Sequence, residues 1–217
     1  MENKNEKEEL IKYLKENGLY IAKKEDFESL ASVSGRAYQD YPLWCYYSDG
    51  VYDKELVKQT SLCSLYTIHD EAVIYSDSEE LNSLVILLPP GNIEKKYFFF
   101  IWNGGFKLLY KYGIRKLMRM ADFESFAINM RKNYTNNKDW YLCSICVDKN
   151  CQGKKIGSKL MKPLLNYIKL NKQICYLETH WDKNVRIYEH FGFKVLEKSV
   201  VPGTNVGHYA MLFDGNK

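Results

Sequence analysis

The chain has 217 residues, of which 46% are hydrophobic, and a formal net charge of +4 from 31 basic and 27 acidic residues. These values indicate a single domain over residues 1–217 with one buried core. The basic residues are scattered and form no long basic block, so the sequence does not indicate a nucleic-acid-binding protein. The modest positive charge suits an anionic ligand.

The N-terminal residues are charged and lack the apolar core of a signal peptide. Residues 4–17 have helical periodicity, and Leu19–Ala22 follows as a candidate first strand. The most apolar stretch, Tyr97–Trp102, falls far short of the roughly 20 apolar residues that a membrane-spanning helix needs. The sequence therefore predicts a cytoplasmic protein with no membrane partner.

The next elements predict an α/β organisation. Residues 25–38 and 53–69 have apolar positions at helical spacing, and Tyr41–Tyr47 between them is predicted to be an aromatic loop. Glu71–Tyr75 and Asn82–Leu88 are predicted to be paired strands. Helices therefore alternate with strands in this half of the chain.

Residues 97–134 have helical spacing in two pieces that break around Gly113, which indicates a helical insertion. From Trp140 to Phe213 the pattern predicts strand, helix, strand, helix, strand. Residues 1–139 and 140–213 are thus two halves of one α/β domain.

The strand Trp140–Val147 is nearly continuously apolar, as a central strand covered on both faces requires. It contains Cys143 and Cys146, two of six cysteines that follow no disulfide spacing. Side chains three apart on a strand point to opposite faces, and no second Cys or His pair has matching spacing. No metal site is therefore expected.

The turn Asp148–Gly157 joins this strand to a helix whose apolar residues recur every four positions. A glycine-containing turn between a strand and a helix start aims unpaired backbone N–H groups and the positive end of the helix dipole at an anion. Lys154 and Lys155 add positive charge there. The turn therefore predicts an anion site.

Two further segments follow in order. Ile174–His180 has the pattern of the next strand, and Asn184–Phe193 is predicted to be a short helix ended by Gly192. With the run Gln152–Gly157 they resemble the GNAT N-acetyltransferase family, whose signature is Gln/Arg-x-x-Gly-x-Gly/Ala. Lys155 stands where that family usually has its first glycine.

The resemblance covers residues 140–212, and the Gln-Gly-Lys turn is nearest to the puromycin N-acetyltransferase type. It implies a GNAT fold, with a central mixed twisted sheet of about six to seven strands flanked by helices and a helical insertion before the fourth strand. It also implies acetyl-CoA as acetyl donor. The residues expected to bind acetyl-CoA are Ile145, Cys146, Val147, Gln152, Gly153, Lys154, Lys155, Ile156, Gly157, Ser158, Asn184 and Tyr188.

The reaction suggests roles for three side chains. A tyrosine with a pKa near 10 stays protonated at neutral pH, so Tyr188 is the candidate general acid for the departing thiolate. Glu178 and His180 lie two apart on one strand face, where an amine must lose a proton. Glu178 is the first candidate for the base or for positioning a water, and His180 is the second.

Cys146 lacks an evident activating base, so direct transfer is favoured over an acyl-cysteine. The acceptor is expected to be a small-molecule amine, because the segments that the resemblance assigns to the acceptor wall are aromatic. Two alternatives stay open: a peptide or protein amine, and a non-catalytic module that senses acyl-CoA. The expected state is a monomer or a homodimer.

Overall fold

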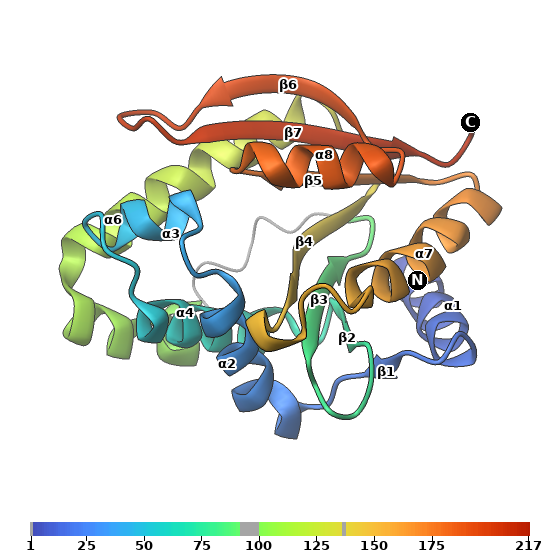
Figure 1. Ribbon diagram of the computed structural model, residues 1–217, viewed down its shortest axis with the longest axis horizontal. Coiled ribbons are helices and arrows are strands. Elements are labelled where there is room, and N and C mark those ends of the chain that lie inside the picture. The colour runs from blue at the N-terminus through green and yellow to red at the C-terminus, as the bar shows by residue number, and fades with distance from the viewer. Residues whose placement is uncertain (1, 92–99, 136–137) are drawn as a thin grey trace.

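The computed structural model describes residues 2–91, 100–135 and 138–217, and its fold is a mixed seven-stranded sheet flanked by helices (Figure 1). The strands are β1 Tyr20–Ile21, β2 Val73–Ser76, β3 Ser83–Leu88, β4 Trp140–Val147, β5 Ile174–Thr179, β6 Lys194–Val200 and β7 Gly207–Asp214. The helices are α1 Glu2–Glu16, α2 Phe27–Ala37, α3 Pro42–Tyr47, α4 Lys54–Ile68, α6 Phe106–Lys132, α7 Ile156–Leu170 and α8 Asp182–His190. Short helical turns are η1 Lys24–Asp26, η3 Ile101–Gly105 and η4 Lys149–Cys151.

The strands lie in the order β1-β2-β3-β4-β5-β7-β6. Among these neighbours, β4 and β5 run parallel and the other pairs run antiparallel. A parallel pair needs a crossover connection, and α7 supplies it between β4 and β5. The expected mixed sheet, with a helical insertion before its fourth strand, is confirmed.

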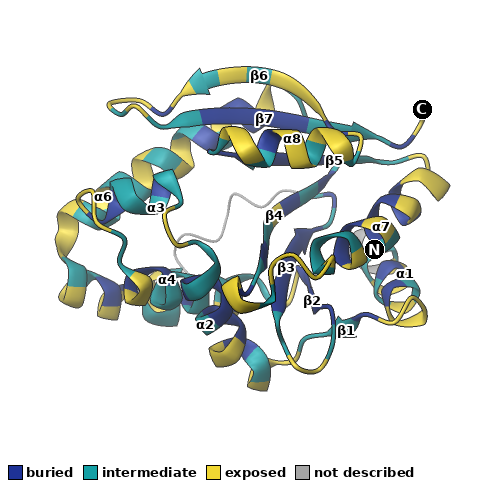
Figure 2. Ribbon diagram, viewed as in Figure 1, coloured by how far each residue is buried: buried dark blue, intermediate teal, exposed yellow. Residues whose placement is uncertain are grey.

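Side-chain alternation along the strands builds a core on each face of the sheet (Figure 2). Val73 and Tyr75 point to the face that α1 and α7 cover, whereas Ile74 points to the face that α2 and α4 cover. Trp140 is completely buried, and its Nε1 donates a hydrogen bond of 2.8 Å to Gln173 Oε1. Burial of its indole nitrogen therefore leaves no donor unsatisfied.

Two sequence expectations were wrong. The expected aromatic loop is largely the helix α3, because Pro42 at its start has a φ suited to a first helical turn. Leu43 and Tyr47, four residues apart, are buried in one cluster on the same side of α3. The final expected strand is instead the hairpin of β6 and β7, whose connection contains Gly203 at φ +74°.

The predicted break in the insertion is confirmed. Gly113 has φ +78° and ψ 162°, values that interrupt helical geometry within α6. The predicted start of the insertion at residue 97 lies outside the described residues. No helix among those described is long and apolar enough to cross a membrane.

Candidate active site

The centre of the site is the place where β4 and β5 separate. The two strands pair at Trp140, Tyr141 and Leu142, while β5 continues to Thr179 on its other side with β7. The register of β4 with β3 skips Cys143, which marks a bulge. Within these described strands β4 therefore diverges from β5 beyond Leu142, as Figure 1 shows.

The bulge exposes backbone groups of β4. Along an antiparallel pair, the N–H groups of alternate residues point away from the partner strand. In the part of β4 from Ser144 to Val147, the N–H groups of alternate residues point away from β3 and toward β5. The pairing of β4 with β5 has already ended at Leu142, so β5 does not pair with this part of β4. These N–H groups are therefore donors that a carbonyl oxygen can use.

The turn after β4 ends at the start of α7. Gln152 Nε2 donates to Val147 O over 3.2 Å, which ties the turn back to the strand. Lys155 is the N-cap of α7 and has the left-handed conformation, with φ +62° and ψ 15°. Lys155 thus occupies a backbone conformation that favours glycine, at the place where the family signature has one.

The local structure fits an anionic cofactor. A Cβ added to Gly153 or Gly157 would meet no atom within 4 Å, so packing inside the protein does not require glycine's small size there. The N–H groups of the first turn of α7 have no partner within the helix. Lys154 and Lys155 are exposed beside them. Space, N–H donors and positive charge therefore coincide at this turn.

A groove of about 540 Å³ continues from this turn between α7 and the C-terminal end of α8. Lys162 and Lys169 of α7 and His190 of α8 lie along it, and its apolar lining includes Leu165 and Phe191. The groove offers positive charge beyond the turn itself.

An ion pair anchors the turn to α2. Arg36 contacts the Asp148 carboxylate at 2.5 Å, and that carboxylate also accepts from Asn150 N–H over 3.1 Å. Burial opposes ionisation of Asp148, but the hydrogen bond and charge of Arg36 outweigh it and lower the pKa of the carboxyl. The pair therefore fixes the end of β4 against α2.

Tyr188 faces the divergence from α8. Its ring packs against the same core as Ile145 and Val147. Burial, and the neighbouring Tyr41 and Cys146, raise the pKa of the Tyr188 phenol well above its usual value. Tyr188 therefore remains a proton donor at neutral pH. Asn184 is one helical turn earlier and projects from the same side of α8.

Cys146 points to the opposite face, into the core formed by α2. Its thiol is buried, lies 3.8 Å from Ser34 Oγ, and has a pKa raised to about 12 by burial. A thiol with this pKa is a poor nucleophile at neutral pH. The geometry thus favours direct transfer over an acyl-cysteine.

Glu178 lies on β5, on the acceptor side of the divergence. Its Oε2 accepts a hydrogen bond of 2.7 Å from Tyr141 Oη. Burial raises the pKa of the Glu178 carboxyl to about 7, although Arg131 and Tyr141 act in the opposite direction. A carboxyl with a pKa near neutrality suits a general base.

His180 is held between two protein groups. Its Nδ1 lies 3.1 Å from Tyr41 Oη, and its Nε2 lies 3.0 Å from Nδ1 of the completely buried His208. Burial and the neighbouring His208 lower the pKa of His180 to about 3. Both ring nitrogens are engaged, so the geometry favours Glu178 over His180 as the group that meets the amine.

Tyr41 was not among the sequence candidates, yet it connects them. Its hydroxyl accepts from His180 N–H over 2.9 Å. Burial raises the pKa of Tyr41, with a further contribution from Glu178, and Tyr41 in turn affects the pKa of Tyr188. Tyr41 therefore lies among the candidate acid and both candidate bases.

The acceptor side combines rings with charges. Arg131 of α6 lies 4.2 Å from the ring of Tyr141, and Glu124 is one of the charges that affect the pKa of Glu178. Successive ring contacts join α3, α6, the residue that follows β5, and β7. The rings in these contacts are Trp44, Tyr47, Phe123, Phe126, His180 and His208.

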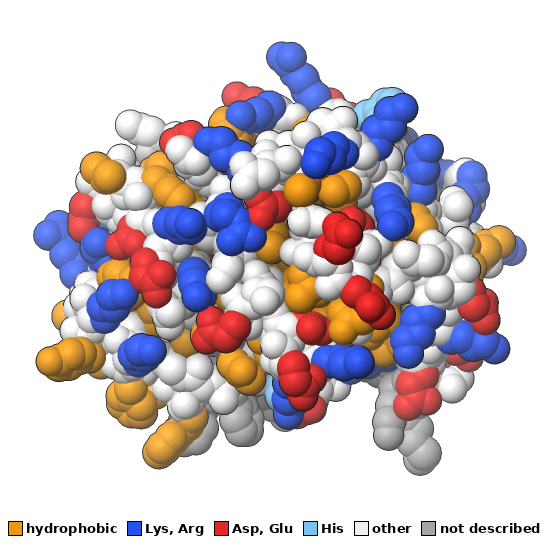
Figure 3. Space-filling view, turned by 60° about the horizontal axis from the view of Figure 1, so that its bottom comes forward, with side chains coloured by type: hydrophobic (Ala, Val, Ile, Leu, Met, Phe, Trp, Pro, Cys, Tyr) orange, Lys and Arg blue, Asp and Glu red, His pale blue; other side chains and the backbone are white. Residues whose placement is uncertain are grey.

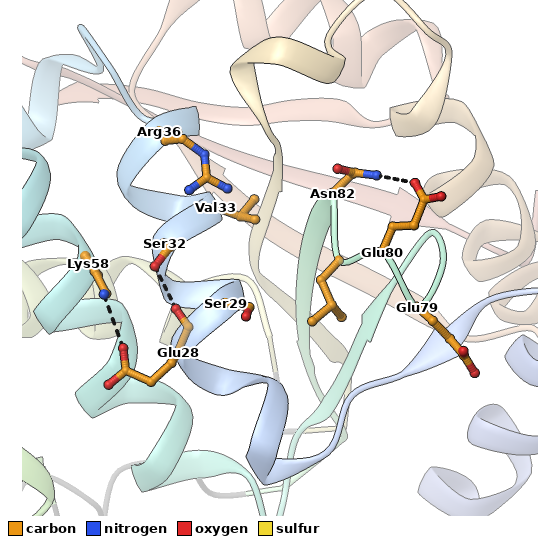
Figure 4. Close-up of a pocket in the computed structure, with 10 residues that line it drawn as sticks. Glu28, Ser29, Ser32, Val33, Arg36, Lys58, Glu79, Glu80 and Asn82 are labelled. Atoms are coloured by element: carbon orange, nitrogen blue, oxygen red, sulfur yellow. Dashed lines mark hydrogen bonds and ion pairs between the residues drawn. The ribbon is translucent and has the colours of Figure 1, made fainter.

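A second hollow, also of about 540 Å³, lies between α2 and the turn that joins β2 to β3 (Figure 4). Its charged groups are largely paired: Glu28 lies 3.2 Å from Lys58, and Asn82 donates to Glu80 over 2.9 Å. It contains none of the sequence candidates. Among the described residues, no group of three or more His, Cys, Asp or Glu could hold a metal ion.

The arrangement of divergent strands, phosphate-type turn and seven-stranded sheet defines the GNAT fold. Solved structures with this architecture include an acetyltransferase of Corynebacterium glutamicum, with a TM-score of 0.62 and 16% identity over 90% of this chain and 94% of that one. Another is arylalkylamine N-acetyltransferase 2 of Aedes aegypti, with a TM-score of 0.58 and 15% identity over 91% and 98%.

Sequence comparison finds a related domain model and a distant relative. Residues 116–195 match the model of the acetyltransferase (GNAT) domain. The chain is also 23% identical, over 81% of its length and 73% of the relative's, to an uncharacterized N-acetyltransferase of Schizosaccharomyces pombe. Residues 116–195 therefore have the sequence pattern of a GNAT acetyltransferase domain, which supports N-acetyltransferase activity. The nearer likeness to the puromycin type, which rested on Gln152–Lys154, is not supported.

Most of the sequence candidates lie on four elements around the divergence, whereas the Cys146 side chain points away from it. Ile145 and Val147 come from β4, the residues of Gln152–Ser158 from the turn and α7, Glu178 from β5, and Tyr188 from α8. Sequence reasoning missed Tyr41, Arg131 and Tyr141, because their contacts span long separations along the chain that no local pattern marks. The nearest signal was the aromatic composition of Tyr41–Tyr47.

Proposed function

We propose that this chain is an acetyl-CoA-dependent N-acetyltransferase that transfers acetyl directly to the primary amine of a small molecule. The observation that carries the proposal is the divergence of β4 from β5 next to a turn that fits an anionic cofactor. Gly153, Lys155, Gly157 and Ser158 would hold the phosphates of that cofactor. Acetyl-CoA supplies an acetyl group activated as a thioester.

The chain's own groups would do three things. The N–H groups of β4 around Cys146 that point away from β3 would polarise the acetyl carbonyl. Glu178, with a pKa of about 7, would take the proton of the attacking amine, directly or through a water. Tyr188, whose phenol is protonated at neutral pH, would donate its proton to the departing sulfur.

A small-molecule acceptor is favoured by the aromatic rings on the acceptor side. Phe123 of α6 contacts Tyr47 of α3 and His180, which directly follows β5, so residues of α3, α6 and the end of β5 line this region. Glu178 and Glu124 add negative charge that suits an ammonium group. A peptide or protein amine is the alternative that the same chemistry would serve.

The first test is a thermal shift with acetyl-CoA. A ligand at 100 times its dissociation constant adds about 2.7 kcal/mol of stability, which raises the Tm of a chain of this size by about 5–11 °C. Absence of any shift would reject the cofactor. Thiol release is then measured with a panel of aryl-alkyl amines, polyamines and peptides. Turnover of peptides alone would indicate the protein-amine alternative.

The catalytic reading is tested with Tyr188→Phe. We expect a fall in kcat with unchanged affinity for acetyl-CoA, whereas Tyr13→Phe on α1, away from the divergence, should change neither. Binding of acetyl-CoA without thiol release across the whole panel would instead identify a sensing module.

A further inference from the structure

Residues 100–121 are unusual in charge. This segment forms η3 and the first part of α6, and it contains no acidic residue. Its five basic residues are Lys107, Lys111, Arg115, Lys116 and Arg119. The chain as a whole has 31 basic and 27 acidic residues, so this segment departs strongly from the average.

The same segment exposes large apolar side chains. Phe106 is 58% exposed, Tyr110 95%, Ile114 61% and Met118 57%. Phe106 and Tyr110 are one helical turn apart before the break at Gly113, and Ile114 and Met118 are one turn apart after it. Of the 13 exposed large hydrophobic side chains in the described part of the chain, six lie between residues 101 and 118. Figure 3 shows hydrophobic side chains projecting in a row at the lower left, beside basic ones. We call Phe106, Tyr110, Ile114 and Met118, with Lys107 and Arg115, the α6 surface.

The core of the protein does not need these side chains. Leu108 is 2% exposed, and it packs with Tyr112, Leu117 and Met120 against the cluster of α3 and α4. The segment is therefore apolar on its inner side and again on its outer side. A concentration of exposed apolar area of this kind marks an interaction site more often than a chance surface.

We propose that the α6 surface docks this protein on an anionic lipid bilayer, in contrast to the expectation from the sequence that it has no membrane partner. Exposed aromatic and aliphatic side chains flanked by Lys and Arg are the pattern of helical segments that lie in the membrane interface, and the two helical pieces on either side of Gly113 both carry it. Lys111 forms an ion pair with Glu55, and Lys116 forms one with Asp49. Lys107 and Arg115 are exposed, and their own segment contains no acidic residue. This contact lies on the bilayer surface and involves no spanning helix.

Repulsion between basic residues disfavours a dimer formed through the α6 surface. A twofold contact through the α6 surface would place Lys107 and Arg115 of one protomer near the same residues of the other. That repulsion is absent when the opposing surface carries negative headgroups, which attract Lys and Arg. The α6 surface also lies on the side of the molecule opposite α7 (Figure 1), so docking would leave the cofactor turn accessible.

The test is flotation of the full chain with vesicles of phosphatidylcholine alone or with phosphatidylglycerol added. We expect binding to the mixed vesicles only, weakening as salt is raised. Phe106→Ser with Tyr110→Ser, and separately Lys107→Glu with Arg115→Glu, should each lower the bound-to-free ratio about tenfold or more.

Two matched controls keep the test specific. Leu170→Ser removes an apolar side chain that is 72% exposed on α7, and Lys15→Glu with Lys24→Glu makes the same charge change elsewhere. Both should bind like the unchanged chain, and circular dichroism should show every variant folded. No binding of the unchanged chain to anionic vesicles would overturn the proposal. A dimer in light scattering that Phe106→Ser with Tyr110→Ser dissociates would overturn it in favour of self-association.

Discussion

Replacing Lys155 by glycine separates a backbone effect from a charge effect at the cofactor turn. Lys155 has φ +62°, a conformation that costs a residue with a Cβ about 1–2 kcal/mol. Glycine removes that cost but loses about 0.5–1 kcal/mol through the greater freedom of the unfolded chain. We therefore expect Lys155→Gly to raise the free energy of unfolding by about 0.5–1 kcal/mol, or the Tm by about 1–4 °C.

Two other variants isolate the causes. Lys155→Ala keeps the Cβ and therefore the backbone cost, so its Tm should not rise. Lys172 is also a lysine in the left-handed region, with φ +52°, and it follows the other end of α7. Lys172→Gly should raise the Tm by a similar amount without touching the cofactor turn.

Affinity for acetyl-CoA, measured by calorimetry, reports the side chain. If the Lys155 ammonium contacts a phosphate, both Lys155→Gly and Lys155→Ala should weaken binding about 10- to 100-fold, while Lys172→Gly leaves it unchanged. The backbone argument is refuted if Lys172→Gly raises the Tm and Lys155→Gly does not. The charge argument is refuted if Lys155→Ala binds acetyl-CoA as tightly as the unchanged chain.

Three further outcomes are expected. In the unchanged protein kcat/KM for an accepted amine should rise with pH through about 7, as the Glu178 carboxyl loses its proton; in Glu178→Gln this limb of the pH profile should vanish, with a rate loss of about 10²- to 10⁴-fold. Asp148→Asn should lower the free energy of unfolding at pH 7 by about 1–2 kcal/mol, since it removes the charge that Arg36 contacts. The pKa of Asp148 is lowered in the folded protein, so denaturant titrations should show this difference shrinking as the pH falls below about 4. Leu164→Ala should destabilise the chain by about 2–5 kcal/mol in the same assay, because Leu164 is completely buried in the core under α7.

Local patterns predicted much of the fold correctly. The apolar run of β4, the turn after it and the four-residue spacing of α7 are consecutive in sequence, so periodicity alone could identify them. The break at Gly113 was likewise visible, because glycine is the residue that tolerates φ +78°. Elements of this kind depend on neighbours a few residues apart.

Long-range contacts account for what the sequence did not show. Tyr41 reaches the site through a hydrogen bond to His180, 139 positions away, and no spacing rule relates the two. One of the two contacts of the His180 ring nitrogens is with His208 of β7. The sequence pattern predicts one strand where the structure has both β6 and β7. The left-handed conformation of Lys155 could be inferred only from the family signature, which has a glycine at this position, and not from the residue itself, since lysine does not favour that conformation.

The divergence of β4 from β5 also divides the sheet mechanically. Three residue pairs join these strands, whereas six pairs join β3 to β4 and six join β5 to β7. Few residue pairs therefore connect the two parts of the sheet. Separating β4 from β5 locally should cost less free energy than separating the strands within either part. A ligand that contacts both β4 and β5 would link the two strands and oppose their separation. Amide hydrogen exchange along β4 and β5 should then become slower when the ligand is bound. Binding of the acetyl donor would in this way make the strand that carries Glu178 more rigid before the amine binds.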